Sequence, residues 1–385
     1  MNIIFVGSTV DTQTLKKLSD ASVAGNKMQL GFVQGFIRNG VKTDVISVEP
    51  HAMWKCNGKP TAIKSKTLGE QDVVIQTISY INIPVIKQCS ICFNLLKQIK
   101  RRNISDETIL IVYNTMSMFA LPVLKIASQY KCKAVAIVAD LPIRANKNFL
   151  RRLEDKNQEK LIAKFDGLIL LTKHIAEDFA PNHPSCVVEA GCSEEDCFSI
   201  SKKDENHRSK KVIFSGTLNK LAGIELMIGA MQYLEGHDIE LHIYGNGPLK
   251  KLVEGATVNK NIIYHGCITN EEMLCLQQQA DLLVCPRCAD EYTTRYTFPS
   301  KILEYICAGV PVLANRLMGI PEEYEKYINY SKSEDAKDWA SAIVDILENN
   351  RELYLEKAQT AKRTVLETKT WRIQCEKVVT FLKTI

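Results

Sequence analysis

The sequence predicts an α/β protein with two doubly wound, parallel-sheet (Rossmann-like) domains that face each other across a cleft. The chain has 385 residues, which is enough for two domains with their own cores. Short apolar runs alternate with helical patterns in both halves, as parallel strands covered by helices do. A charged segment with almost no apolar residues, 200–211, separates the halves. We expect this segment to be an interdomain linker.

Six apolar runs in the first half are predicted to be strands. They are NIIFVG, TDVISV, VVIQTI, ILIVYN, AVAIVA and GLILLT, which begin at residues 2, 43, 73, 109, 134 and 167. Helical patterns, for example at 28–39 and 121–130, lie between these runs. This alternation predicts a doubly wound domain over residues 1–199.

The second half repeats the pattern with five apolar runs. They are KVIFSG, ELHIYG, NIIYHG, DLLVCP and VPVLAN, which begin at residues 211, 240, 261, 281 and 310. The last segment, 335–385, is helical in pattern, and Trp371 and Phe381 are expected to anchor its end. We predict a second domain over 212–385, with packing of the last helix against the first domain as the alternative.

Composition excludes several classes of protein. No stretch approaches the roughly 20 apolar residues of a membrane helix, and the first residues lack the basic lead-in of a signal peptide. We therefore expect a cytoplasmic protein. The thirteen cysteines are odd in number and irregularly spaced, which favours buried reduced thiols over disulfides. Two pairs, Cys89/Cys92 and Cys285/Cys288, have a zinc-like gap, but their apolar surroundings argue against a metal site.

The charge of the chain is modest but clustered. A net charge of +5 is too small to indicate a nucleic-acid partner. Two basic clusters stand out: Lys97, Lys100, Arg101 and Arg102, and then Arg144, Lys147, Arg151 and Arg152. Solvated helix faces explain them simply. The alternative is attraction to anionic lipid headgroups at the inner membrane surface, or to a diphosphate on an acceptor.

Glycines follow two predicted strands of the second half. Gly216 ends the run VIFSG, and Gly245, Asn246 and Gly247 end the run ELHIYG. In doubly wound domains ligands bind beyond the carboxyl ends of the strands, where glycine lets the backbone approach closely. A plain tight turn is the alternative for both. Pro248 suits the first position of a helix, and helix N-termini attract phosphate.

The segment 281–315 is the richest in polar candidates. A buried strand leads into a polar loop that contains Arg287 and Arg295, and Ser300 then opens a helix. We predict that Arg295, Ser300 and Lys301 converge on a diphosphate at this helix N-terminus.

The helix that follows carries a carboxylate one turn after Lys301. Glu304 is at i+3 from this lysine and faces the same way. We predict that Glu304 accepts hydrogen bonds from ribose hydroxyls. An intrahelical Glu–Lys pair is the alternative. Ile302, Leu303 and Ile306 are expected to be buried against the sheet, which leaves less room in the core for Lys301, Glu304 and Tyr305.

Residues 212–320 resemble the donor domain of glycosyltransferase family 4, which has the GT-B fold. The matching features, in order, are SGTL with Gly223 downstream, IYGNGP, YHG, QQADLLVCPR, TFPSKILEYICAGVPVLA and GIPEEY. The first half is similar more loosely, in AGNKMQLGFVQGF, TKHIAEDF and VVEAG. The resemblance implies a retaining transferase that uses UDP- or GDP-sugars, with UDP favoured, and polysaccharide, glycolipid or lipid-linked acceptors in cell-surface glycan synthesis.

The resemblance also assigns roles and reveals departures. It implies that Glu304 holds the donor ribose. Apart from the resemblance, we expect the backbone near Gly266 to reach the base. The first of two family glutamates falls on Thr297 here, and an arginine and a lysine of the family fall on Thr217 and Ala222. Lys220 is displaced from that pattern by two residues. Neutralisation of the diphosphate is then left to Arg295, Lys301 and Lys220.

Acceptor-binding candidates lie in the first half. Gly25, Asn26 and Lys27 match the acceptor loop of the family and are predicted to bind an anionic acceptor group, with a flexible loop as the alternative. Asp140 ends the run AVAIVAD. It is predicted either to contact a sugar or to cap a helix.

The predicted reaction needs neither metal nor cofactor. Asp290 and Glu291 are adjacent and would point opposite ways in a strand, so they do not form a metal-binding pair. Cationic side chains and a helix N-terminus can stabilise a leaving diphosphate instead. Two rival functions remain open at this point: a nucleotide-sugar epimerase of the same fold, and a catalytically weak nucleotide-binding scaffold.

Overall fold

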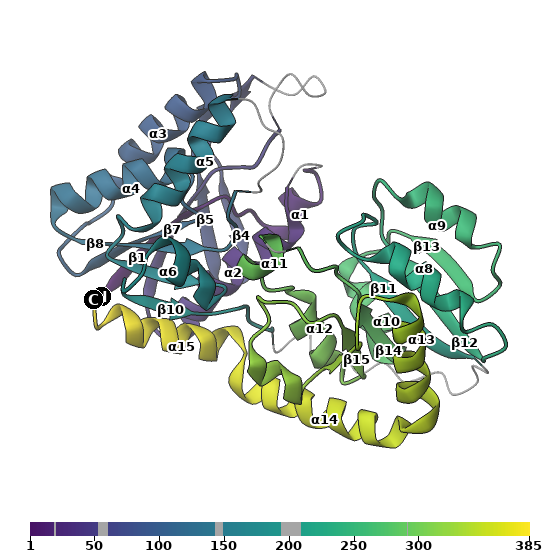
Figure 1. The fold of residues 1–385 in the computed structure, drawn as a ribbon. Coiled ribbons are helices and arrows are strands. Elements are labelled where there is room, and N and C mark those ends of the chain that lie inside the picture. The colour runs from purple at the N-terminus through teal and green to yellow at the C-terminus, as the bar shows by residue number, and fades with distance from the viewer. Residues whose placement is uncertain (19–20, 53–60, 143–148, 194–208, 291) are drawn as a thin grey trace. The chain divides into compact units, whose positions relative to one another are not determined.

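The chain folds into two compact units of α/β architecture. The computed structural model describes residues 1–18, 21–52, 61–142, 149–193, 209–290 and 292–385. The first unit contains residues 1–191 and 371–385, and the second contains residues 192–370. Figure 1 shows the order of their elements along the chain.

The first unit is built on an eight-stranded sheet with the order β10-β9-β8-β7-β1-β2-β5-β4. Its strands are β1 (Asn2–Gly7), β2 (Lys42–Ser47), β4 (Thr67–Glu70), β5 (Val73–Thr77), β7 (Thr108–Tyr113), β8 (Lys133–Val138), β9 (Gly167–Leu170) and β10 (Ser185–Val187). All neighbours are parallel except β4 and β5. A separate antiparallel pair joins β3 (Ala62–Ile63) and β6 (Tyr80–Ile81). All six predicted strands are confirmed, whereas β3, β4, β6 and β10 were not predicted.

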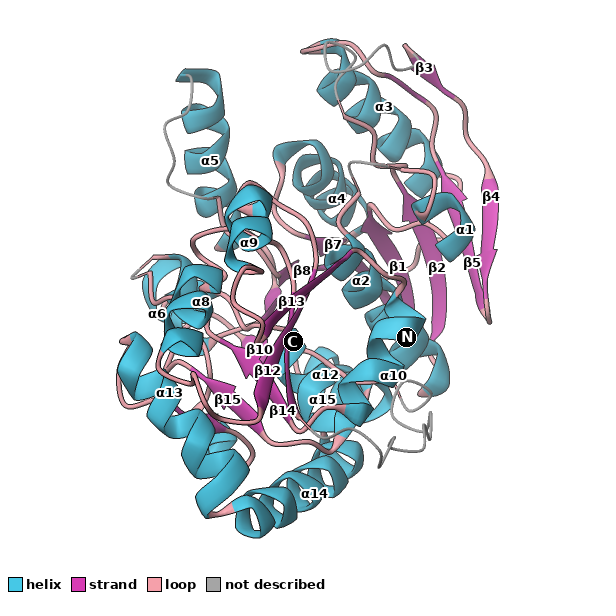
Figure 2. Ribbon diagram, turned by 90° about the vertical axis from the view of Figure 1, so that its right-hand side faces the viewer, coloured by secondary structure: helices cyan, strands magenta, loops and turns pink. Residues whose placement is uncertain are grey.

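Helices surround this sheet. They are α1 (Thr12–Leu15), α2 (Val23–Arg38), α3 (Ile86–Ile99), α4 (Ser117–Tyr130), α5 (Phe149–Ile162), α6 (Lys173–Phe179) and α15 (Trp371–Leu382). α4 lies between α3 and α5 and contacts both (Figure 2).

The last helix of the chain, α15, packs on α2 within the first unit. The Trp371 ring lies 5.0 Å from the Phe32 ring, measured between centroids. A Cβ on Gly31 would come within 2.1 Å of the same indole, so this glycine makes room for it. Of the two predicted arrangements, the structure has the alternative one, in which the last helix belongs to the first unit, because burial of Trp371 fixes residues 371–385 to the helices of the first sheet.

The second unit has a six-stranded, fully parallel sheet with the order β13-β12-β11-β14-β15-β16. Its strands are β11 (Lys210–Ser215), β12 (Ile239–Tyr244), β13 (Ile262–Gly266), β14 (Leu282–Cys285), β15 (Val312–Ala314) and β16 (Asn329–Tyr330). Its α-helices are α8 (Ile224–Gln232), α9 (Lys250–Ala256), α10 (Asn270–Gln279), α11 (Thr293–Tyr296), α12 (Lys301–Ala308), α13 (Ala336–Val344) and α14 (Arg351–Thr368). A 3₁₀-helix, Glu322–Lys326, and a π-helical turn, Asp345–Asn349, complete it.

The predicted linker is shorter than 200–211, because Lys210 and Lys211 already pair with β12 as part of β11. Residues 200–208 lie outside the described ranges, as do Arg144 and Lys147 of the second basic cluster. All five strands predicted for this half are confirmed, and only β16 was not predicted.

One buried side chain links the core of the second unit to the loop after β14. Trp339 of α13 is fully buried, and its Nε1 donates to Asn315 Oδ1 at 2.9 Å. Asn315 Nδ2 in turn donates to the carbonyl oxygens of Pro286 and Arg287, each at 3.1 Å. The core therefore fixes the backbone from which the Arg287 side chain starts.

The burial of the cysteine side chains agrees only in part with the prediction from the sequence. Cys132, Cys307 and Cys375 are buried, but Cys89 and Cys267 are exposed, so the prediction of buried thiols is wrong for these two. Within the described ranges, no group of three or more His, Cys, Asp or Glu side chains is arranged to hold a metal ion. No described helix is both long and apolar enough to cross a bilayer.

Candidate active site

Three strand-end glycines of the second unit lie together. Gly216 N donates to Tyr244 O at 2.9 Å, and Gly245 N donates to Gly266 O at 2.8 Å. A Cβ on Gly245 would lie 1.8 Å from Gly216 O, and its φ of +139° is also unfavourable for other residues. Glycine is therefore required at 245 for the loops after β11 and β12 to approach each other.

The segment after β12 is a turn packed on the loop after β11. A Cβ on Gly247 would lie 2.5 Å from Leu218 O, and Leu218 N donates to Asn246 O at 3.0 Å. The exposed Asn246 side chain accepts from Gly247 N at 2.8 Å. The following helix, α9, begins at Lys250, so the prediction of a helix start at Pro248 is wrong. Backbone packing thus accounts for Gly247 without a ligand.

A lysine of α12 reaches the end of β11. Lys301 Nζ donates to Ser215 Oγ at 3.0 Å and also to the Ser215 carbonyl oxygen. The hydroxyl of Tyr305 lies 2.9 Å from Ser215 Oγ. Tyr305 is fully buried, so it has more room in the core than the sequence predicted. Ser215 therefore holds both side chains of α12 at the carboxyl edge of the sheet.

The ammonium of Lys301 is in an electrostatically demanding position. Burial lowers its pKa below the usual lysine value, and the nearby Glu304 carboxylate acts in the opposite direction. A Cβ built on Gly216 would lie 3.6 Å from Lys301 Nζ, so the ammonium sits beside this strand-end glycine. A cation whose hydration shell is partly removed here is suited to an anionic ligand.

Glu304 turns to a different partner. Its Oε1 accepts from Gln277 Nε2 of α10 at 2.7 Å, while Lys301 donates to Ser215. The predicted alternative of an intrahelical Glu–Lys pair thus gives way to two separate contacts. Gln277 is fully buried, and its Oε1 has no hydrogen-bond partner. Gln277 thus orients the Glu304 carboxylate through Oε1 and leaves Oε2 of Glu304 for a ligand.

The loop after β14 contains a short helix, α11, where the sequence predicted only a loop. Arg287 Nη2 donates to Thr297 Oγ1 at 3.2 Å, so Thr297 positions this guanidinium. Arg295 lies on α11, with its guanidinium 5.9 Å from the centre of the Tyr296 ring. Asp290 accepts from Thr293 N at 2.6 Å, and this hydrogen bond lowers the pKa of its carboxyl. The Asp290 side chain thus binds the first residue of α11, and Glu291 lies outside the described residues.

The loops after β11 and β14 are pressed together. A Cβ on Gly223 would lie 1.9 Å from Pro286 O, and Cys288 N donates to Leu221 O at 3.0 Å. Lys220 is exposed on the first of these loops. Ser300 is exposed at the start of α12 and makes no side-chain capping bond. Both are accessible to a ligand at this edge.

An aromatic stack lies beside Gly266. The His265 ring stacks on Tyr244, with ring centres 4.5 Å apart and planes at 5°. His242 Nδ1 lies 3.0 Å from His265 Nε2, and burial lowers the pKa of both imidazoles. Burial thus favours the neutral form of both rings, and the stack forms an aromatic border to the glycine edge.

In the first unit, the predicted acceptor residues begin α2. Asn26 is buried, and its Oδ1 accepts from Val10 N at 2.8 Å and from Thr9 Oγ1 at 3.0 Å. Its Nδ2 donates to Val10 O at 3.0 Å. Gly25 N donates to Ser22 Oγ at 3.0 Å, which caps the helix. Asn26 therefore lies beneath the loop after β1 and anchors it.

We expect the change Asn26→Ala to destabilise the first unit by about 2 kcal/mol or more. It would leave a buried backbone N–H and a buried hydroxyl without their acceptor, and each such loss typically costs about 1–3 kcal/mol. Chemical denaturation of the full chain measures the effect. The neighbouring change Lys27→Ala, at a half-buried position, is the control and should cost less. Equal stability of Asn26→Ala and the wild type would contradict the anchoring role.

Asp140 lies at the end of β8, at the same edge as Gly25. Asn114 Oδ1 accepts from the backbone N–H groups of Ala139 and Asp140, at 2.8 and 3.0 Å. The carboxylate of Asp140 adds to burial in raising the pKa of Tyr113, whose hydroxyl lies 3.9 Å from a Cβ built on Gly25. Residues 143–148, between Asp140 and the described part of α5, lie outside the described residues, and the predicted capping role lies there with them.

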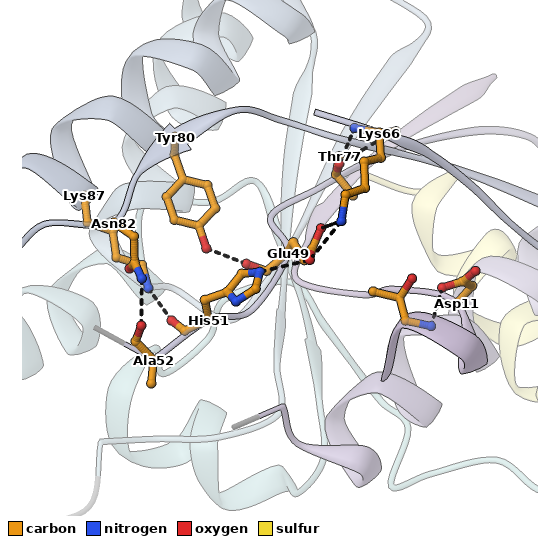
Figure 3. A network of polar contacts seen from close by, with 10 residues as sticks. Asp11, Glu49, His51, Ala52, Lys66, Thr77, Tyr80, Asn82 and Lys87 are labelled. Carbon is orange, nitrogen blue, oxygen red and sulfur yellow. Dashed lines mark hydrogen bonds and ion pairs between the residues drawn. The ribbon is translucent and has the colours of Figure 1, made fainter. Parts of the chain in front are cut away.

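A polar network missed by sequence reasoning holds the loop after β2 (Figure 3). The buried Glu49 carboxylate accepts from Lys66 Nζ at 2.9 Å and lies 2.9 Å from His51 Nε2. Tyr80 OH donates to Glu49 O at 2.7 Å, and Lys87 Nζ donates to His51 O at 2.6 Å. The paired charges fix the backbone at residues 49–52, near the predicted acceptor edge.

The second unit matches a known family. Residues 198–364 match the model of the family described as Glycosyl transferases group 1. The chain therefore contains a group 1 glycosyltransferase domain. This assignment covers the glycine edge, α12 and the loop after β14. A comparison with curated proteins gave no match for the glycosyltransferase.

Solved structures show the same fold over the whole glycosyltransferase. Sucrose-phosphate synthase from Thermosynechococcus elongatus has a TM-score of 0.70 at 14% identity and covers all of this chain and 99% of its own. Anabaena HepE in complex with UDP has a TM-score of 0.69 at 12% identity, with both chains fully covered. The lipopolysaccharide outer core galactosyltransferase WaaB has a TM-score of 0.66 at 12% identity, over all of this chain and 99% of its own. The predicted GT-B fold is confirmed.

Proposed function

We propose that the enzyme transfers a hexose from a UDP-sugar to a polysaccharide, glycolipid or lipid-linked acceptor, with retention of configuration and without a metal ion. The enzyme would act in the cytoplasm, and its acceptors would be precursors of cell-surface glycans. The observation that carries the proposal is the Lys301 ammonium, which is held by Ser215 at the strand edge with Glu304 one turn further along α12. Similar structures support it, because Anabaena HepE was solved in complex with UDP and with UDP-glucose.

Each side chain at this edge receives a role in the proposal. Lys301 and Arg295 stabilise the diphosphate as the bond from the anomeric carbon to its oxygen breaks and a bond to the acceptor oxygen forms. The acceptor hydroxyl loses its proton, and UDP is the leaving group. The donor-binding residues are Gly216, Lys220, Gly245, Asn246, Gly247, Gly266, Arg287, Thr297, Ser300 and Glu304, and the acceptor-binding residues are Gly25, Asn26, Lys27 and Asp140. Asn26 would act through the loop that it anchors.

Nucleotide binding and product analysis test this proposal. At 100 times its dissociation constant, UDP should raise the free energy of unfolding by about 2.7 kcal/mol relative to the empty protein. GDP at the same concentration should raise it less. Incubation with UDP-sugars should release UDP and glycosylate an added glycan or lipid-linked acceptor. A new nucleotide-sugar formed without acceptor would indicate an epimerase, and nucleotide binding with no product would indicate a scaffold. Either result contradicts the proposal.

Turnover should be unchanged in excess chelator. The Asp290 side chain binds the first residue of α11, and the cations and the N-terminus of α12 can neutralise the diphosphate without a metal. The measurement is the rate of UDP release with and without a chelator of divalent ions. Loss of the rate and its recovery on addition of magnesium or manganese would contradict metal independence.

The basic clusters support a peripheral position of the enzyme at the inner membrane surface. Lys97 and Lys100 are exposed on and just after α3, as are Arg151 and Arg152 on α5. Positive charge of this kind is attracted to anionic lipid headgroups.

A further inference from the structure

Helix α3 presents an unusual exposed stripe. Ile86 and Phe93 are 45% and 67% exposed, and they lie on the face opposite Ile91 and Leu95, which are fully buried in the unit. An exposed phenylalanine on a well-packed helix leaves a large apolar surface in water, and a group of such side chains marks an interaction surface. The stripe is therefore a candidate for contact with an apolar phase or partner.

The same stripe becomes basic toward its C-terminal end. Lys97 and Lys100 follow Phe93 at helical spacing, and both are exposed. In the sequence from residue 82 to residue 139, the only acidic residues are Asp106 and Glu107, in the loop before β7. α3 and α4 thus carry positive charge without compensating carboxylates of their own.

Helix α4 continues this surface beside α3. Leu121 is 47% exposed, and Lys125 is exposed one turn later. Burial raises the pKa of the Cys92 thiol of α3, and the Lys125 ammonium lies close enough to act in the opposite direction, so the exposed faces of α3 and α4 are neighbours. We call Ile86, Phe93, Lys97, Lys100, Leu121 and Lys125 the basic–aromatic surface.

Helix α5, on the other side of α4, has the same composition. Phe149 is 72% exposed, Leu153 is 49% exposed, and Lys156 is exposed one turn beyond. Figure 2 shows α3, α4 and α5 as three neighbouring helices of the first unit. The combination of protruding apolar rings and lysines therefore occurs on both flanks of α4.

We propose that the basic–aromatic surface docks on an anionic lipid bilayer. Apolar side chains that enter the headgroup region, with lysines directed to lipid phosphates, are the standard combination for interfacial binding. A second copy of the chain fits less well, because a two-fold contact would bring Lys97 and Lys100 against their own counterparts. Protruding Phe93 also needs no shaped pocket in a bilayer.

This membrane contact rests on the proposed function, because a glycolipid or lipid-linked acceptor would bring the enzyme to a lipid surface. The contact lies on α3 and α4 of the first unit. Substrates presented at the bilayer surface, such as a lipid-linked or glycolipid acceptor, would then be met by a bound enzyme.

Sedimentation of the full chain with vesicles tests the proposal. The chain should bind vesicles of phosphatidylglycerol mixed with phosphatidylcholine, and bind much more weakly to phosphatidylcholine alone. High salt should weaken the binding, because charged headgroups are screened. Equal binding to both kinds of vesicle, or binding to neither, would overturn the proposal.

Matched variants identify the surface. Each lysine near an anionic membrane contributes about fivefold in affinity, so Lys97→Gln with Lys100→Gln should weaken binding about 30-fold. Phe93→Ser should weaken it about tenfold through lost apolar burial. Tyr233→Ser, and Lys251→Gln with Lys260→Gln, are the controls at exposed positions of the second unit and should bind like the wild type. Wild-type binding by both α3 variants would refute the assignment.

Two further readouts separate the possible failures. UDP affinity in the absence of vesicles should be unchanged in every variant. If the wild type does not bind UDP, the proposed donor is wrong, while the vesicle measurement still tests the membrane contact. Sedimentation velocity without lipid reports self-association. A dimer that Phe93→Ser dissociates, with vesicle binding unaltered, would assign the surface to a second copy and overturn the membrane proposal.

Discussion

Replacement of Lys301 by alanine should lower turnover by about 100-fold or more, with the fold retained. Loss of one preorganised donor to a developing negative charge has this order of effect in other enzymes. Lys301 qualifies because its ammonium is fixed by Ser215 before any ligand arrives. Steady-state kinetics with a UDP-sugar measures the change, and Arg295→Ala should lower turnover in the same direction.

The fold is expected to tolerate this loss, for a reason visible in the protonation of the lysine. Burial lowers the pKa of Lys301, so the unfolded chain holds this proton more tightly than the folded chain does. Stability therefore rises with pH between the folded and unfolded pKa values, and the charged form costs stability below them. Lys301→Met should be as stable as the wild type or more so, and yet catalytically impaired.

The same shift predicts a pH profile. kcat/KM reports the free enzyme, so it should fall with rising pH before the usual range of lysine, as the ammonium loses its proton. The bound diphosphate favours the charged form, so the corresponding fall in kcat should occur at higher pH. Wild-type turnover in both Lys301→Ala and Arg295→Ala, or a flat profile, would show that the charge is neutralised elsewhere.

The fold was predictable because each central strand is a short apolar run, as in β1 and β11, and parallel strands buried on both faces need such runs. The elements that were missed carry weaker signals. β16 is a two-residue strand with half-buried residues, and α11 is a four-residue helix supported by the side chains of Asp290 and Thr297, which both bond to Thr293. The placement of α15 depends on the absence of a side chain at Gly31, where the Trp371 ring packs, and no local sequence pattern reveals this contact.

The candidate site was predictable where spacing along one helix decides it, as for Lys301 and Glu304. Partners from distant elements were not. Ser215, Gln277 and Asn315 contact the site across 86, 27 and 29 residues of sequence, respectively. Tyr305 could have been found, since a tyrosine at i+4 from a strand-edge lysine shares its face. Asn26 shows the converse, because its polarity suggested a ligand whereas burial made it an anchor.

Glu304→Gln should weaken nucleotide binding by about 5- to 30-fold and leave the melting temperature of the empty protein nearly unchanged. Gln keeps the shape and can still accept from Gln277, but charge-assisted hydrogen bonds to ribose hydroxyls are about twice as strong as neutral ones. Such a loss corresponds to about 1–2 kcal/mol. Glu304→Ala should weaken binding further.

The matched control for this prediction is Gln277→Leu, which removes the support of the carboxylate but not the carboxylate itself. It also removes the buried Oε1 that has no partner, so the empty protein should remain stable. Titration calorimetry with UDP should then rank the variants: Gln277→Leu binds more tightly than Glu304→Ala, and both bind more weakly than the wild type. Glu304 would be a purely structural residue if its variants melted at a clearly lower temperature and bound UDP as the wild type does. That outcome is disfavoured because Glu304 is half-buried and accepts its hydrogen bond from the neutral amide of Gln277, a bond that glutamine at position 304 can also accept.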